Sequence, residues 1–295
     1  MKNMLLSIII PTYKDDIRLD KCIMSIVESK FSGDIEIIVC DNDPEKSCAI
    51  QPKQYVFDDK TIDLKVVHEV LPGSYNARNE AAKFATSEVL VFIDSDCYLE
   101  GNAIENIASQ QVCKGFIFAF NIEMESSDSF FGAYDEFFGI PQKYYVEKLG
   151  FSVTAGLAID KQSFFNLNGF KSNIFSGGDR EFCERAIESG FELVFLSDVI
   201  VFHPVRSCLS AILSKENRLA SGIVDRARKH SAKKIFQIND FFPPISQIKS
   251  GFYTGRKVPI YKVIIAISLS YPIKLYRQFC KLKHSISSKR IIVRS

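Results

Sequence analysis

Two aspartates that directly follow an apolar segment have the clearest capacity for chemistry in this sequence. Asp94 and Asp96 stand two apart, with Ser95 between them, after residues 89–93, which read Val-Leu-Val-Phe-Ile. Strand alternation would direct both carboxylates to one side of a sheet, where their like charges attract a cation. Hard divalent cations such as Mn²⁺ or Mg²⁺ prefer oxygen ligands and commonly combine one or two carboxylates with substrate phosphates. A solvated Asp-Ser-Asp turn explains the same residues equally well.

Two further polar residues stand where they could contact a nucleotide. Asp41 follows the apolar residues 35–40 and could accept a hydrogen bond from a nucleobase N–H, although the turn-forming Asp-Asn-Asp-Pro at 41–44 explains it better on its own. Arg78 follows Pro-Gly at 72–73, near an expected helix start, where its guanidinium and free backbone N–H groups could bind phosphate. A solvated surface arginine is the alternative for Arg78.

Asp179 and His203 are candidates for acid–base and metal chemistry. Asp179 follows two glycines at an expected helix start, so it is predicted to cap that helix, and it could also act as a general base on a hydroxyl group. His203 follows a short apolar run and precedes a proline. A lone histidine is usually structural, so a metal-ligand role requires that the fold bring His203 to Asp96.

Alternating strands and helices are predicted to position these residues. Four apolar runs predict buried strands, at residues 5–10, 35–40, 64–67 and 89–93. A helix between the first two is indicated by apolar residues at helical spacing, Leu19, Cys22, Ile23, Ile26 and Val27. The alternation predicts a Rossmann-like, doubly wound, mostly parallel α/β sheet, in which ligands bind beyond the carboxyl ends of the strands. Residues 11–13, Asp41 and the Asp94–Asp96 pair all stand at such ends.

Further elements are expected along the rest of the chain. A helix is predicted at about residues 77–85, strands at 156–160, 193–195 and 199–203, and a long helix at 207–229. Phe116, Phe118 and Phe120 alternate as in a half-buried strand. A short helix after Asp179 is expected to turn four residues inward, Phe182, Cys183, Ala186 and Ile187. The aromatic cluster at 130–138 is favoured as core over a surface that stacks on sugar or lipid.

Charge divides the chain into an acidic body and a basic end. The 295 residues are 46% hydrophobic and 24% charged, which is typical of a globular protein. From Lys249 onward there are 11 Lys/Arg and no Asp or Glu, which leaves 26 Lys/Arg against 35 Asp/Glu before it. We therefore expect residues 1–230 to form the α/β domain and residues 231–295 a basic, partly apolar helical extension.

The first residues and the cysteines indicate the cellular compartment of the protein. The apolar run at 5–10 is short, and no small-residue cleavage site follows it, so we interpret it as a buried strand rather than a secretory signal. Eight cysteines without a CxxC pair argue against a zinc site and a disulfide framework. Both observations favour a cytoplasmic protein.

The basic end has a pattern that suits a membrane surface. Its apolar stretch, residues 258–273, falls short of the ~20 residues that a spanning helix needs. Lysines and arginines then alternate with Leu275, Tyr276, Phe279 and Leu282, as in an interfacial helix attracted to anionic lipid on the inner face of the cell membrane. A terminal helix packed on the domain with a solvated basic face is an equal alternative. Nucleic-acid binding is not expected, because no binding motif accompanies the charge.

Taken in order, these motifs resemble family 2 glycosyltransferases with the GT-A fold. Residues 7–13, Ser-Ile-Ile-Ile-Pro-Thr-Tyr, are similar to the family's opening strand, Asp41 to its uracil-binding aspartate, and Asp94-Ser95-Asp96 to its DxD metal motif. Residues 72–79, 156–170, 177–185 and 203–222 resemble its helix entry, its acceptor side and the stretch after it.

The resemblance implies a metal-dependent, inverting transfer of a sugar. The donor would be a nucleotide-sugar, expected to be a UDP-sugar, and the acceptor a saccharide or lipid-linked molecule in cell-surface polysaccharide synthesis. Residues 1–100 would bind the donor and residues 101–230 the acceptor. The implied donor-binding residues are Pro11, Thr12, Tyr13, Asp41, Arg78, Asp94 and Ser95. The implied ligands of Mn²⁺ or Mg²⁺ are Asp96, Asp94 and His203, and the implied catalytic base is Asp179.

Two departures from the family pattern leave alternatives open. Gly178 stands where the family often has glutamate, and residues 41–43 read Asp-Asn-Asp rather than the commoner Asp-Asp-Gly-Ser. Gly178 is the feature that favours a non-catalytic scaffold that binds a nucleotide-sugar or a partner enzyme. A sugar-phosphate nucleotidyltransferase is a second alternative, but residues 11–15 lack the glycine-rich loop that it would need.

Overall fold

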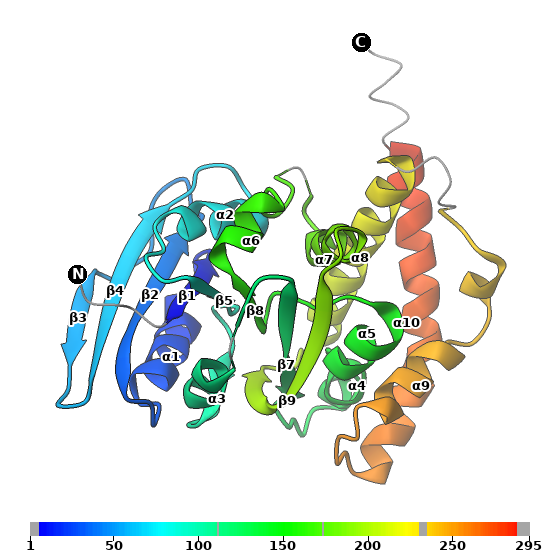
Figure 1. Ribbon diagram of the computed structural model, residues 1–295. Coiled ribbons are helices and arrows are strands. Elements are labelled where there is room, and N and C mark those ends of the chain that lie inside the picture. Colours follow the sequence, from blue (N-terminus) through cyan, green and yellow to red (C-terminus); the bar gives the residue numbers. More distant parts are fainter. Residues whose placement is uncertain (1–5, 111, 173, 230–234, 288–295) are drawn as a thin grey trace. The chain divides into compact units, whose positions relative to one another are not determined.

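A computed structural model describes residues 6–110, 112–172, 174–229 and 235–287 (Figure 1). The chain forms two compact units. The first comprises Met1–Glu123, Gln142–Asn173 and Gly178–Pro204, and the second comprises Met124–Pro141, Ile174–Gly177 and Val205–Ser295. Every residue predicted for the site lies in the first unit. The units do not coincide with a boundary at residue 230, and the functional division into residues 1–230 and 231–295 stays a prediction.

The first unit is built on a nine-stranded sheet with the strand order β3-β4-β2-β1-β5-β8-β7-β9-β6. The strands predicted from the four apolar runs form its parallel part, β1 (Leu6–Thr12), β2 (Gly33–Asp41), β4 (Lys60–His68) and β5 (Val89–Phe92). β1 lies between β2 and β5 and is buried along its whole length. A strand covered on both faces has no solvent side, which explains its isoleucine-rich sequence. Leu5, predicted as the first residue of this strand, lies outside the described residues.

Antiparallel pairing extends the sheet on both sides. β3 (Lys53–Val56) pairs with β4, β5 with β8 (Leu157–Asp160), and β8 with β7 (Phe116–Met124). β9 (Glu192–His203) pairs with β6 (Tyr98–Leu99), so the two short strands predicted within this segment are one strand of 12 residues. The half-buried prediction for β7 is also wrong, because Ile117 and Ala119 are buried between the buried Phe118 and Phe120. β7 is an interior strand of the sheet, where both faces are covered.

Six helices of the first unit are described, α1 (Asp16–Val27), α2 (Ser74–Lys83), α3 (Ala103–Ser109), α5 (Gln142–Leu149), α6 (Lys161–Asn166) and α7 (Gly178–Glu188). The five residues predicted to face inward from α1 are its buried ones. α2 begins after Gly73, whose φ of 119° favours glycine. In α7 the prediction for Ile187 is wrong, because its side chain is 42% exposed. At 100° per residue Ile187 lies beyond the arc that Phe182, Cys183 and Ala186 share.

The second unit is helical over its described residues. Its elements are α4 (Phe130–Phe138), α8 (Leu209–Lys229), the 3-10 helix η1 (Ile238–Phe241), α9 (Ile245–Tyr253) and α10 (Ile260–Ser287). Figure 1 shows α10 alongside α8. Tyr134, Phe137 and Phe138 of α4 are buried in a cluster with residues of α8 and α10, so these members of the aromatic cluster are core, as predicted. Phe130 remains 55% exposed.

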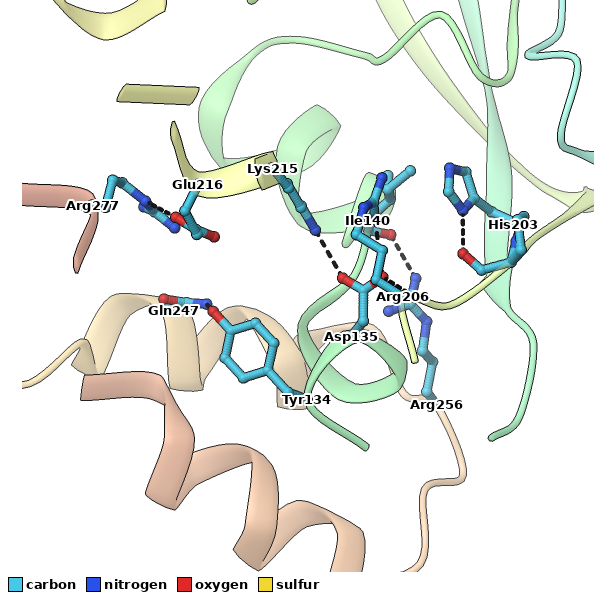
Figure 2. Close-up of polar contacts among 11 residues, drawn as sticks. Tyr134, Asp135, Ile140, His203, Arg206, Lys215, Glu216, Gln247, Arg256 and Arg277 are labelled. Atoms are coloured by element: carbon cyan, nitrogen blue, oxygen red, sulfur yellow. Dashed lines mark hydrogen bonds and ion pairs between the residues drawn. The ribbon is translucent and has the colours of Figure 1, made fainter. Parts of the chain in front are cut away.

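Buried ion pairs hold α4 to its neighbours in this unit. Figure 2 shows the fully buried carboxylate of Asp135 between Lys215 Nζ and Arg206 Nη1, each 2.9 Å away. Burial by itself would raise the pKa of Asp135, but the two cations outweigh it and hold that pKa well below its usual value. Glu136 lies 2.9 Å from Lys262 Nζ of α10, and Arg277 of α10 pairs with Glu216 of α8. Cations of the basic end therefore serve as buried partners of acids.

Two general properties complete the description. None of the helices in the described ranges combines the length and the apolar character needed to cross a membrane. All eight cysteines carry free thiols.

Candidate active site

The carboxyl ends of three parallel strands bring the candidate residues to one edge of the sheet. Thr12, the last residue of β1, is the register partner of Asp41, the last residue of β2. Asp94 follows β5 by two residues, and Ile93 is held to β1 by a hydrogen bond from its N–H to the carbonyl oxygen of Ile9, at 3.1 Å. Parallel strands end on the same side, which is why residues so far apart in the sequence share an edge.

The first-strand residues differ in exposure. Pro11 and Thr12 are buried, whereas Tyr13 is 58% exposed. No partner of the buried Thr12 hydroxyl is found within the described ranges. A buried hydroxyl is normally satisfied by protein, water or ligand, so this atom is available to a bound molecule.

Asp41 is almost fully buried, and its carboxylate organises the loop after β2. It accepts hydrogen bonds from the backbone N–H groups of Asp43 at 2.9 Å and Cys48 at 3.1 Å, and one oxygen lies 3.6 Å from His68 Nδ1. These bonds support the alternative interpretation of Asp41, in which its side chain forms a turn in residues 41–44. A role in reading a nucleobase stays a prediction. The sequence analysis did not single out His68, which stands at the end of β4.

Asn42 holds the segment that leads into α2. Its side-chain amide donates to the carbonyl oxygens of Glu69 at 2.7 Å and Leu71 at 2.8 Å, and it accepts from the N–H of Gly73 at 2.7 Å. The departure from the family pattern at residues 41–43 therefore has a structural use. Sequence reasoning missed this residue because its partners are backbone atoms about thirty residues away.

Arg78 of α2 and Asp94 form an ion pair. The arginine is only 3% exposed, so the solvated alternative is wrong for this residue. Arg78 Nη2 contacts Asp94 Oδ1, while Arg78 Nε is buried and finds no partner in the part of the chain that the structure describes. The two aspartates were expected to attract a cation. For Asp94 that cation is Arg78.

Asp96 and His203 come together, as a metal-ligand role for His203 requires. One ligand atom each from Asp96, Cys97 and His203 lies within 4.8 Å of the others, in a group that does not include Asp94. His203 is 4% exposed, and its Nδ1 lies 2.8 Å from the carbonyl oxygen of Pro204 (Figure 2). A carbonyl oxygen can only accept, so Nδ1 carries the proton, and in a neutral imidazole Nε2 keeps its lone pair.

This donor set fits a hard divalent cation through oxygen and nitrogen. A histidine that donates one N–H to a carbonyl oxygen is the usual arrangement of a metal-binding imidazole. The buried thiol of Cys97 lies 3.8 Å from Asp96 Oδ1 as a hydrogen-bond donor, and burial, followed by Asp94 and Asp96, raises the pKa of that thiol. Arg18, 55% exposed, lies 3.7 Å from the other Asp96 oxygen and would have to yield to a cation. Ser95 is partly buried between the two aspartates.

Asp179 lies in the first turn of α7 rather than at its cap. The helix begins at Gly178, and the carboxylate of Asp179 accepts from the N–H of Arg180 at 2.8 Å. Burial raises the pKa of Asp179, against the opposing effects of that N–H group, Arg78 and the Tyr75 hydroxyl. A carboxyl group with a raised pKa is a stronger base than an ordinary aspartate, which suits proton abstraction near neutral pH.

Tyr75, like His68 and Asn42, was not predicted from the sequence. Its ring lies 2.7 Å from the position that a Cβ on Gly178 would take, and its hydroxyl lowers the pKa of Asp179. Tyr75 and Arg78 stand three residues apart on α2, so they share one face of the helix. One face of α2 thus contacts both Asp94 and Asp179, and the helical spacing of Tyr75 and Arg78 was the available signal.

Comparison with known proteins identifies the family. Glycosyl transferase family 2 matches residues 7–174, which is more than half of the chain. Glycosyltransferase AglE of Haloferax volcanii is 26% identical over 220 residues, which span 73% of this chain and 72% of AglE. The UDP-Glc:alpha-D-GlcNAc-diphosphoundecaprenol beta-1,3-glucosyltransferase WfgD of Escherichia coli is 30% identical over 150 residues, 50% of this chain and 56% of WfgD.

Solved structures show the same fold at low identity. The mannosyltransferase PcManGT of Pyrobaculum calidifontis superposes with a TM-score of 0.59 at 12% identity, over 96% of this chain and 87% of that one. Residues 1-349 of S. aureus TarS superpose with a TM-score of 0.53 at 16% identity, over 96% of this chain and 89% of that one. The fold is therefore GT-A, and the chain belongs to family 2 of the glycosyltransferases.

Proposed function

We propose that this glycosyltransferase moves a sugar from a UDP-sugar to a hydroxyl group of a saccharide or lipid-linked acceptor, with inversion, in the synthesis of a cell-surface polysaccharide. The observation that carries the proposal is the approach of Asp96 and His203 ligand atoms within 4.8 Å at the edge of the sheet. The acceptor class is suggested by the name of WfgD, a relative that shares half of this chain. Family membership argues against the nucleotidyltransferase alternative and favours a catalytic role over a non-catalytic scaffold.

The chain's own residues divide the work. Pro11, Thr12, Tyr13 and Asp41 would line the nucleotide pocket, with the Thr12 hydroxyl available for a bond to the donor. Arg78 holds Asp94, so both would face the donor as a neutral pair, with Ser95 beside them. Asp96 and His203 would hold Mn²⁺ or Mg²⁺, and Asp94 enters the ligand set only if its bond to Arg78 loosens. With the ion bound, this site supplies positive charge against the negative charge that grows on the leaving diphosphate.

Asp179 would act on the acceptor. As the acceptor hydroxyl oxygen bonds to the anomeric carbon, the bond from that carbon to the diphosphate oxygen breaks, and the hydroxyl proton passes to the Asp179 carboxylate. One displacement of this kind inverts the anomeric configuration. We propose a cytoplasmic location for this reaction, because eight free thiols suit a reducing compartment.

Manganese binding to matched variants tests whether Asp96 and His203 form a metal site. Calorimetry with Mn²⁺ should show binding to the wild-type chain and its loss in Asp96→Ala, because a carboxylate ligand is gone. Cys97→Ser is the matched control, since serine keeps a donor beside Asp96 and hard ions do not need sulfur. Thermal-shift measurements with UDP-sugars and GDP-sugars, with and without Mn²⁺, should select a UDP-sugar. Undiminished Mn²⁺ binding by Asp96→Ala would refute the metal site.

A further inference from the structure

Helix α10 turns two of its lysines inward and several large apolar side chains outward. Lys262 and Lys281 are 4% and 3% exposed, and they pair with Glu136 and Asp240. Ile264 and Phe279 of the same helix are 60% and 63% exposed. A helix that faces water normally has the opposite arrangement, so the outer face of α10 is built for something other than water.

The exposed apolar residues share one side of the helix. They are Ile260, Tyr261, Ile264, Tyr271, Leu275, Phe279, Leu282 and Ile286, which we call the α10 stripe. At 100° per residue they occupy an arc of about 100°, interrupted by Ser268, along a 28-residue helix that contains Pro272 and is about 40 Å long. The other side of the helix is occupied by α8 and α4. Scattered surface apolar residues need no explanation, but eight on one side of a helix mark an interaction surface.

Aromatic residues from the preceding segment lie beside the middle of the stripe. The Tyr271 hydroxyl donates to the carbonyl oxygen of Phe241 at 2.8 Å, and Lys274 Nζ donates to that of Phe242 at 2.9 Å. Phe241 and Phe242 are themselves 53% and 58% exposed. These bonds fix the backbone of η1 and of the residue after it against α10, so two exposed phenylalanines stand on a segment held beside the stripe.

The segment that carries this surface is basic in sequence. From Lys249 to the end the chain has 11 Lys/Arg and no Asp or Glu, and Asp240, the last acidic residue, is paired with Lys281. Among the described residues, Lys262, Arg277 and Lys281 are paired with acids, so the charge available to a partner comes from other residues. Lys257 precedes α10 and is exposed, and Lys283 is exposed in its last turns. An apolar stripe with basic residues at both ends matches the anionic headgroup layer of a membrane, where aromatic and lysine side chains are favoured.

We propose that the α10 stripe docks on an anionic lipid bilayer, with the helix lying along the surface. A spanning arrangement is ruled out for α10 because it would place the Lys262–Glu136 and Arg277–Glu216 pairs in hydrocarbon. Self-association through the stripe would bring two basic ends together, whereas phosphatidylglycerol headgroups neutralise them. The inference does not depend on the donor, the acceptor or the catalytic residues, because it concerns the second unit alone.

Vesicle sedimentation of the full chain tests the proposal. The wild-type chain should pellet with vesicles of phosphatidylcholine and phosphatidylglycerol, and less with phosphatidylcholine alone. Ile264→Ser with Phe279→Ser should weaken this binding by about tenfold or more, because two anchors lose their apolar surface. Val56→Ser with Phe84→Ser is the matched control and should bind as wild type, since it removes one aliphatic and one aromatic side chain that are 70% and 48% exposed in the first unit.

A charge variant and a mass measurement complete the design. Lys257→Gln with Lys283→Gln should weaken binding to phosphatidylglycerol vesicles by about fivefold per lysine and reduce its salt dependence. Every substituted side chain is exposed, so the melting temperatures should stay near wild type, and Phe279→Ser alone serves if the double variant unfolds. Equal pelleting of wild type and stripe variant overturns the proposal. A second outcome also overturns it. In that outcome the wild-type chain does not bind vesicles, and light scattering shows a dimer that the stripe substitutions convert to monomer.

Discussion

Tyr75 of α2 and Asp179 of α7 interact at the candidate base, where the tyrosine hydroxyl opposes the effect of burial and lowers the pKa of the aspartate. The Tyr75 ring occupies the space beside Gly178, the residue before Asp179. Both residues lie in the first unit, and the contact ties the start of α7 to the face of α2 that carries Arg78. We interpret Tyr75 as a positioning residue that orients Asp179 and lowers its pKa.

Tyr75→Phe should move the pH dependence of the reaction. The hydroxyl lowers the pKa of Asp179 against the larger effect of burial, so its removal raises that pKa further. Because the base then ionises at a higher pH, the acidic limb of the kcat/KM profile should shift to higher pH. Tyr55→Phe, which removes a hydroxyl from β3, should leave the profile in place.

Gly178→Ala tests whether the tyrosine ring explains the missing glutamate. A methyl group there would lie 2.7 Å from a ring carbon, and overpacking of this kind costs about 1–3 kcal/mol. The gain in helix propensity is at most about 1 kcal/mol, so the variant should melt at a lower temperature and lose activity as Tyr75 shifts. Gly101→Ala has open space around it and is the control. Full activity and stability of Gly178→Ala would contradict the packing argument.

Asp179→Asn should abolish transfer and raise stability at neutral pH. Loss of a general base lowers kcat by about 10²–10⁴, whereas donor binding should persist because the donor contacts are elsewhere. The pKa of Asp179 is raised in the folded chain, so stability falls as pH rises from 3.8 through the folded value, where the partly buried carboxyl must ionise. Asparagine does not ionise, so the variant does not lose this stability as the pH rises.

Melting curves over a pH series distinguish this effect from a general one. The difference between Asp179→Asn and wild type should be largest at neutral pH and vanish below pH 3.8, where both side chains are uncharged. A lower melting temperature for Asp179→Asn at pH 7 would contradict this prediction, because it would show that the ionised carboxylate stabilises the fold.

Asp135→Asn should destabilise the second unit. Its carboxylate is fully buried between Lys215 and Arg206, and removal of one partner from a buried ion pair costs about 3–5 kcal/mol. The pKa of Asp135 is lowered, so its contribution is present above 3.8 and is lost as pH falls through the folded value. Urea denaturation measures the loss. Asp225→Asn, on the exposed side of α8, should stay within about 0.5 kcal/mol of wild type.

Local patterns were sufficient for the parallel half of the sheet. Continuous apolar runs predicted β1, β2, β4 and β5, because strands covered on both faces must be apolar throughout. Helical spacing predicted the buried side of α1 in full. The same logic failed at β7 and β9, because whether a strand is interior, and whether two short runs join, depends on neighbours far away in the sequence.

The amino-acid sequence alone determined the family, the parallel strands whose ends carry the site and the identity of Asp94, Asp96, Asp179 and His203 as candidates. These follow from residue types and short spacings. The tertiary structure alone decided which of them meet. It paired Asp94 with Arg78, grouped Asp96 with His203, set Tyr75 against Asp179, and turned Lys262 and Lys281 of α10 inward. The reason is physical, since each of these contacts joins side chains from separate elements, and its strength depends on burial that no local pattern records.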